Sequence, residues 1–333
     1  MATQSSSIST SDLSFATLRT TKVPLSDHGR LSTDMNHAHT VPDWDFAWLR
    51  QSLWRYEMST SQVNSGFVKV DNAQLYYETA GKGIPFVMIH AGVADSRQWN
   101  NEFAFLARNY KAVRYDLRGY GKSEPVDGEF SHMSDLVSLV DALGLREPMI
   151  LMGCSMGGGL AMDFALAHPS KVKALIMVGS GPSGLELDVP RPAKFAEVEK
   201  AFEAGDLDRT AEIETQIWFD GADRTPEQVD QAMRRLAYEM DRLALAHEVI
   251  QLGKRLPNTE IPAFNRLTEL KIPVLIIVGA HDIPYILAAA DYMMEKIPSA
   301  KKVRIEDAAH LPNMDHPNEF QTIVKTFLEG LSS

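Results

Sequence analysis

Hydrophobic and polar residues follow two different patterns along the chain. Phe67–Val70 and Leu75–Thr79 alternate apolar and polar residues on either side of Asp71-Asn72, which predicts an antiparallel hairpin. Further on, short runs are apolar almost throughout, as is typical of parallel strands that are covered on both faces. These runs are Pro85–Ile89, Ala112–Tyr115, Met149–Met152, Ala174–Val178, Val274–Val278 and Val303–Ile305.

Between these runs, apolar residues recur at helical spacing. One such stretch begins at Asp135 and stops at Gly144, a second runs from Leu160 to His168, and a third, from Phe320 to Phe327, closes the chain. Strands that alternate with helices in this way predict an α/β fold with a doubly wound, mostly parallel sheet of eight strands.

A long segment interrupts the alternation. Between residues 184 and 267 no convincing strand pattern occurs, and helix-like sequence covers Phe195–Ala204, Thr210–Trp218 and 225–252, the last with capping residues at Thr225, Pro226 and Gln228. Open α/β folds bind ligands at the carboxyl edge of the sheet. We therefore predict a helical cap over 184–267, inserted into a core formed by 58–183 and 268–333. The alternative is that this segment only extends the core.

The first 57 residues differ from the rest of the chain. Residues 1–40 contain fifteen Ser or Thr, which favours disorder, and their three aspartates argue against a transit peptide. Residues 41–57 hold three of the five tryptophans, which predicts a short helix packed on the body of the protein, with a docking or dimer contact as the alternative. We expect residues 1–57 to be an extension without a catalytic part.

Charge and composition narrow the functional classes. The chain carries 33 Lys and Arg against 44 Asp and Glu, a net charge of −11, which repels nucleic acid and anionic lipid. No apolar run approaches the ~18 residues that a membrane span needs, and no secretory signal pattern opens the chain. The one cysteine, Cys154, permits no internal disulfide and no multi-thiolate metal site. We expect a cytoplasmic monomer or homodimer with no nucleic-acid or membrane partner.

A nucleophile motif lies between an apolar run and a helix. Gly153-Cys154-Ser155-Met156-Gly157 has the spacing G-x-S-x-G, which places Ser155 on a sharp strand-to-helix turn with its hydroxyl above the sheet. The plainer interpretation is a glycine-rich turn without chemistry. Because a serine hydroxyl is a weak nucleophile, the catalytic interpretation also requires a base and a group that orients the base.

With these residues the sequence resembles the α/β-hydrolase superfamily over about residues 67–330. The resemblance implies a catalytic triad in the chain order serine, acid, histidine. Asp282 matches the acid, because it follows the run Val274–Val278, and His310 matches the base, because it follows Val303–Ile305. The family often has glycine before its histidine, and here Ala309 stands at that position.

Other candidates fit these roles less well. We expect His90, His168, His281 and His316 to be structural, and Asp307 and Asp315 to be solvated carboxylates beside the histidine loop. The segment from Asp116 to Ser123 matches a family hallmark, and we predict a structural turn there. Cys154 is expected to face inward as a small apolar residue.

The resemblance also implies an oxyanion hole. The N–H of Met156 supplies one donor, and the second comes from the loop His90-Ala91-Gly92, where we expect Gly92, with Ala91 as the alternative. Four aromatic residues either line an acyl pocket or belong to the core: Trp99, Trp218, Phe219 and Tyr285.

The expected activity is hydrolysis of a small or medium carboxylic ester through an acyl-enzyme. No metal, nucleotide or flavin is expected, since the sequence has neither a Walker loop nor a strand-linked G-x-G-x-x-G. A serine nucleophile disfavours the relatives that use aspartate. Lactonases, carbon–carbon bond hydrolases, aminopeptidases and perhydrolases share the constellation and stay open, as does a small-molecule sensor without significant turnover.

Overall fold

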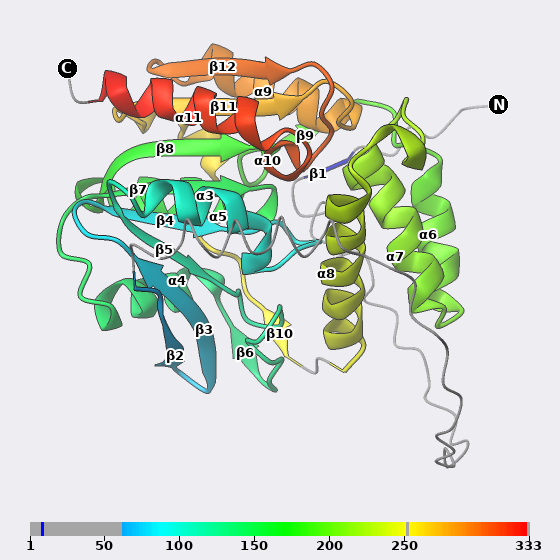
Figure 1. Cartoon of the computed structure of the whole chain (residues 1–333), viewed down its shortest axis with the longest axis horizontal. Helices are drawn as coiled ribbons and strands as arrows, with labels where there is room; N and C mark the ends of the chain where they lie inside the picture. The colour runs from blue at the N-terminus through cyan, green and yellow to red at the C-terminus, as the bar shows by residue number, and fades with distance from the viewer. Residues whose placement is uncertain (1–7, 10–61, 251–252, 332–333) are drawn as a thin grey trace.

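The computed structural model describes residues 8–9, 62–250 and 253–331. Its centre is a mixed sheet of eight strands in the order β12-β11-β8-β7-β4-β5-β3-β2 (Figure 1). The strands are β2 Asn64–Val70, β3 Ala73–Ala80, β4 Pro85–Ile89, β5 Lys111–Tyr115, β7 Met149–Cys154, β8 Val172–Val178, β11 Val274–Gly279 and β12 Ala300–Ile305. Strand β3 runs antiparallel to both of its neighbours, β2 and β5, and the other neighbouring pairs in this sheet are parallel. The predicted doubly wound α/β fold is confirmed.

Helices cover the sheet on both faces. Every residue of β4 and β7 is buried, because side chains on either side of these central strands pack under helices. Helices α3 and α11 contact each other, and so do α4 and α5. The core helices are α3 Asn100–Leu106, α4 His132–Ala142, α5 Met156–Ala167, α9 Pro284–Lys296, α10 Pro312–Asp315 and α11 Pro317–Gly330, with 3₁₀ turns η2 Ser96–Trp99, η3 Pro169–Lys171 and, at the boundary with the insertion, η7 Leu267–Glu269.

Residues 184–267, which lie between β8 and β11 in the chain, are called the helical insertion here. They contain α6 Lys194–Glu203, α7 Leu207–Thr215, the π-helix η4 Gln216–Asp220, the 3₁₀ turn η5 Pro226–Gln228, α8 Gln231–Ile250 and the 3₁₀ turn η6 Ala263–Asn265. Figure 1 shows α6, α7 and α8 standing together at one end of the sheet. These three helices therefore lie at one end of the sheet rather than over either of its faces.

Two details of the insertion differ from the sequence prediction. The capping box of Thr225 and Gln228 is present, but it closes η5, and α8 begins only at Gln231 because Val229 is extended. Two short strands also occur where no strand pattern was found. β9 Glu186–Leu187 pairs with β1 Ile8–Ser9, and β10 Lys254–Arg255 pairs with β6 Glu129–Phe130. Strands of two residues are too short to produce a hydrophobic pattern.

The predictions for residues 1–57 lie outside the described residues, apart from Ile8–Ser9. Within the part of the chain that the structure describes, no helix is both long enough and apolar enough to cross a bilayer.

Candidate active site

The predicted site residues follow the carboxyl ends of parallel strands. Ser155 comes directly after β7, Asp282 follows β11, His310 follows β12, and Gly92 lies three residues beyond β4. Because these strands are parallel, their carboxyl ends lie at one edge of the sheet. The four loops therefore approach each other although they are far apart in the sequence.

The turn that carries Ser155 is strained. Ser155 has φ 51° and ψ −118°, and it is the only residue other than glycine with positive φ in the described ranges. A Cβ on Gly153 would lie 2.2 Å from the carbonyl oxygen of Gly157, and one on Gly157 would lie 2.4 Å from that of His90. The motif thus needs glycine on both sides of Ser155, because the backbone segments pass too closely for any side chain.

The acid and the base lie in direct contact. Nδ1 of His310 is 2.8 Å from Oδ2 of Asp282, and both side chains are buried. The second carboxylate oxygen of Asp282 accepts a hydrogen bond of 2.7 Å from the N–H of Ile283. With Nδ1 directed to the carboxylate, Nε2 is the ring nitrogen available to take a proton.

The backbone of His310 adjoins the nucleophile turn. Its carbonyl accepts a hydrogen bond of 3.7 Å from the thiol of Cys154, the residue before Ser155. Its N–H donates to the carbonyl of Trp218 at 3.1 Å, and the rings of Trp218 and His310 lie 4.5 Å apart. The structure therefore joins Asp282 to His310 and sets the His310 backbone against the neighbour of Ser155.

The two predicted oxyanion donors are neighbours. A Cβ placed on Gly92 would lie 3.8 Å from the side chain of Met156, which begins helix α5 at its positive end. The N–H of Ala91 already donates to Oε1 of Gln98 at 2.9 Å. Ala91, the alternative donor, therefore has its amide engaged inside the protein, which favours Gly92.

A buried polar network behind this loop was missed by sequence reasoning. Asn313 donates to the carbonyl of Gln98 at 2.8 Å and to Oε2 of Glu102 at 3.0 Å, and the Gln98 amide donates back to Asn313. The network links the Gly92 loop to the segment that follows His310. Burial raises the pKa of Glu102 to about 7. No local sequence pattern predicts a contact between residues that are 215 positions apart.

The four histidines that were weighed against His310 have structural contacts. His90 accepts from the N–H of Leu117 at 3.0 Å through Nε2, and burial lowers its pKa. His168 packs on Phe164, with ring centroids 4.7 Å apart. His281 lies 3.8 Å from a carboxylate oxygen of Asp223, and Nε2 of His316 lies 3.0 Å from the carbonyl of Asp307.

The two rival acids differ from each other. The Asp307 side chain is exposed, as predicted. The prediction of a solvated carboxylate is wrong for Asp315, whose side chain is only 5% exposed and forms a 2.7 Å ion pair with Arg224. Arg224 belongs to the helical insertion, and the sequence analysis did not identify it as a candidate.

Two further structural predictions are confirmed. Asp116 accepts hydrogen bonds of 2.8 Å from the N–H groups of Ser96 and Lys122, which stabilises the hallmark turn. Cys154 is fully buried, and burial raises the pKa of its thiol to about 12. A buried thiol that stays protonated is a poor nucleophile.

The four candidate pocket residues are all buried. Trp218 lies on His310, as described above, and the carbonyl of Phe219 accepts a hydrogen bond of 2.8 Å from Arg224. The Tyr285 hydroxyl donates to the carbonyl of Leu185 at 2.8 Å. Trp99 packs against Phe320 of α11, with ring centroids 6.4 Å apart. Of the four, Trp218 has the direct contact with a predicted catalytic residue.

No group of three or more His, Cys, Asp and Glu side chains is arranged to hold a metal ion within the described ranges.

The chain is similar to known proteins in sequence and fold. A family model described as "alpha/beta hydrolase fold" matches residues 84–317. A pimeloyl-[acyl-carrier protein] methyl ester esterase of Aeromonas hydrophila is 30% identical over 254 residues, which are 75% of this chain and 98% of the relative. A 2-hydroxy-6-oxononadienedioate/2-hydroxy-6-oxononatrienedioate hydrolase of Dechloromonas aromatica is 27% identical over 283 residues, 81% of this chain and 96% of the relative.

Solved structures agree on the fold. A thermophilic esterase from Thermogutta terrifontis superposes with a TM-score of 0.65 at 22% identity, over 82% of this chain and all of that one. The family model covers well over half of the chain. The chain therefore belongs to the α/β-hydrolase fold family.

Proposed function

We propose that this protein is a serine hydrolase that cleaves small or medium carboxylic esters through an acyl-enzyme. Ser155 attacks the acyl carbon while Nε2 of His310 takes its proton and passes it to the leaving alkoxide. Asp282 orients the imidazole and stabilises its protonated form. Water then attacks the acyl-enzyme with His310 again as the base, which releases the acid and restores Ser155.

The charge that develops on the acyl oxygen needs fixed donors. In the proposal the N–H groups of Gly92 and Met156 supply them, and the position of Met156 at the first turn of α5 adds the favourable end of the helix dipole. The helical insertion is proposed to act as a cap over this edge of the sheet and to bound the acyl pocket with Trp218 and Phe219. No metal or organic cofactor takes part in these steps.

The observation that carries the proposal is the buried contact of 2.8 Å between Asp282 and His310, on loops that leave the same sheet edge as the strained turn of Ser155. The esterase relative, 30% identical, supports ester chemistry. A second candidate is hydrolysis of a carbon–carbon bond beside a ketone, which the relative at 27% identity favours. Both reactions use the same nucleophile and differ in the substrate.

A substrate panel separates these candidates. We expect many turnovers per protein molecule with p-nitrophenyl acetate or butyrate, and loss of at least about 10³-fold of that rate in Ser155→Ala with an unchanged circular dichroism spectrum. A substantially higher kcat/KM for a 2-hydroxy-6-oxo-dienoate than for any ester would favour the carbon–carbon bond hydrolase. A single stoichiometric burst without turnover would favour a sensor, and an undiminished rate in Ser155→Ala would refute the assignment of the nucleophile.

A further inference from the structure

A short segment of the insertion, residues 216–222, contains the π-helix and packs against both loops that carry the proposed acid and base. The carbonyl of Trp218, inside the π-helix, accepts the N–H of His310, and the Trp218 ring lies against the imidazole. Just beyond the π-helix, the N–H of Ala222 donates to the carbonyl of His281 at 3.2 Å. His281 directly precedes Asp282, so one short segment of the insertion contacts both loops. π-Helical turns are rare and often occur at functional sites.

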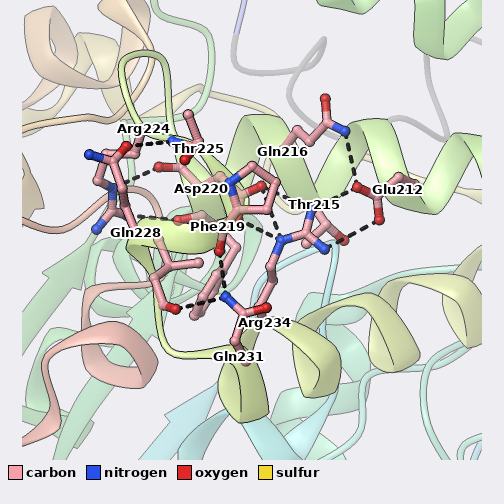
Figure 2. A network of polar contacts seen from close by, with 12 residues as sticks. Glu212, Thr215, Gln216, Phe219, Asp220, Arg224, Thr225, Gln228, Gln231 and Arg234 are labelled. Atoms are coloured by element: carbon pink, nitrogen blue, oxygen red, sulfur yellow. Dashed lines mark hydrogen bonds and ion pairs between the residues drawn. The ribbon is translucent and has the colours of Figure 1, made fainter.

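Arg224 fastens the end of this π-helix. Its Nη2 and Nε donate to the carbonyls of Phe219 and Asp220 at 2.8 and 2.7 Å, as Figure 2 shows. Both carbonyls lie at the C-terminal end of the π-helix, where carbonyl groups need partners and a positive charge is favourable. One side of the guanidinium is thus used within the insertion.

The other side of the same guanidinium reaches the core. Nη1 of Arg224 donates to the carbonyl of Asp307 and lies 2.7 Å from Oδ2 of Asp315. These residues stand three positions before and five positions after His310. The Arg224 and Asp315 side chains are only 9% and 5% exposed, so water screens this ion pair little.

We infer that Arg224 is a positioning residue for His310, because it clamps the π-helix of the insertion to both sides of the histidine loop. A planar guanidinium can serve several oxygens in fixed directions, which an ammonium group cannot. Loss of the clamp frees the Trp218 carbonyl and ring from their place against His310. This inference rests on the proposed function in so far as His310 is the base.

Arg234 provides a matched comparison. It is the second arginine in the same cluster, and its guanidinium pairs with Asp220 at 2.9 Å and with Glu212 at 2.7 Å (Figure 2). Both partners belong to the insertion. A change at Arg234 therefore weakens the insertion itself, whereas a change at Arg224 also releases the histidine loop.

The experiment compares Arg224→Gln with Arg234→Gln in the full chain. We expect Arg224→Gln to lower kcat about 10- to 100-fold with KM within about threefold, since small misplacements of a catalytic group have effects of this size. The rate at which a fluorophosphonate probe modifies Ser155 should fall in parallel. Arg234→Gln should lower the melting temperature while kcat stays within about threefold of wild type.

Two results would overturn the clamp. One is a folded Arg224→Gln with wild-type kcat and probe rate, and the other is an equal loss of kcat in both variants. If Arg224→Gln does not fold, Asp315→Asn answers the same question, because it removes the ion pair and leaves the insertion intact; we expect a loss in kcat of about 3- to 10-fold, and a wild-type rate contradicts the clamp.

The probe also separates this inference from the proposed function. If the wild-type protein reacts with the fluorophosphonate but hydrolyses no ester, the ester assignment fails while the relative probe rates still decide the clamp.

Discussion

At the scale of single residues, we expect Asp→Asn to affect kcat very differently at positions 282 and 307. Asp282 is buried and its carboxylate contacts Nδ1 of His310, whereas Asp307 offers its backbone carbonyl to Arg224 and exposes its side chain. We expect Asp282→Asn to reduce kcat about 10³- to 10⁴-fold, because an amide cannot hold the imidazole in the required tautomer. Asp307→Asn should change kcat less than about threefold.

The measurement is kcat and kcat/KM of both variants on p-nitrophenyl butyrate at neutral pH, with thermal melting as a check that both fold. The reverse ranking of the two variants would transfer the role of the acid to Asp307.

Residues with a local signature could be predicted from the sequence, and residues without one could not. Ser155 has the glycine spacing that its turn requires, and Asp282 and His310 follow apolar strands in the chain order of the family. Arg224 and Asn313 have no such signature. Their contacts span 83 and 215 positions, and only the folded chain defines these.

At the scale of elements, one buried carboxyl couples stability to pH. Glu102 in α3 accepts from Asn313 of α10, and burial raises its pKa from 4.5 to about 7. The folded state therefore binds this proton more tightly than the unfolded chain does. This proton binding contributes roughly 3 kcal/mol to the free energy of unfolding. The contribution is fully present below pH 4.5 and is lost as pH rises through about 7.

We therefore expect Glu102→Gln to remove this pH dependence. The free energy of unfolding should be measured with urea at several pH values. Between pH 5 and pH 8 it should fall in wild type relative to Glu102→Gln, so that the difference between the two changes in favour of the variant. Glu147→Gln, at an exposed position, serves as the control and should track wild type. Parallel curves for Glu102→Gln and wild type would show that Glu102 does not carry the effect.

Element boundaries were predicted well where one signal decides them. Helix α4 ends two residues before Gly144, a glycine with φ 62° that stops a helix. The start of α8 was predicted too early, because the capping box at Thr225 is real but is followed by an extended residue, Val229. The π-helix had no signal in the sequence, because its hydrophobic pattern over so few residues does not differ from that of an α-helix.

At the scale of the whole molecule, the sequence predicted the doubly wound sheet from apolar runs that alternate with helical segments. Such runs mark strands buried on both faces, because these strands must be apolar throughout. The position of the helical insertion at one end of the sheet is visible in the structure (Figure 1). Neither the sequence patterns nor the fold identifies the substrate. Esters and carbon–carbon bonds are cleaved by relatives of similar identity, so the difference lies in pocket shape rather than in the shared chemistry.

We expect residues 1–57 to be dispensable for activity. Every strand of the eight-stranded sheet lies between residues 64 and 305, and the proposed acid, base and nucleophile, together with Arg224 and its partners, all lie within residues 90–316. Removal of residues 1–57 takes away only the two-residue strand β1 from the described elements. We therefore expect a chain that begins at Met58 to keep kcat/KM within about threefold of wild type and to melt as one cooperative unit. A collapse in solubility or rate would mean that the tryptophan-rich segment 41–57 packs on the core and completes it, because the site residues themselves are unchanged in the truncated chain.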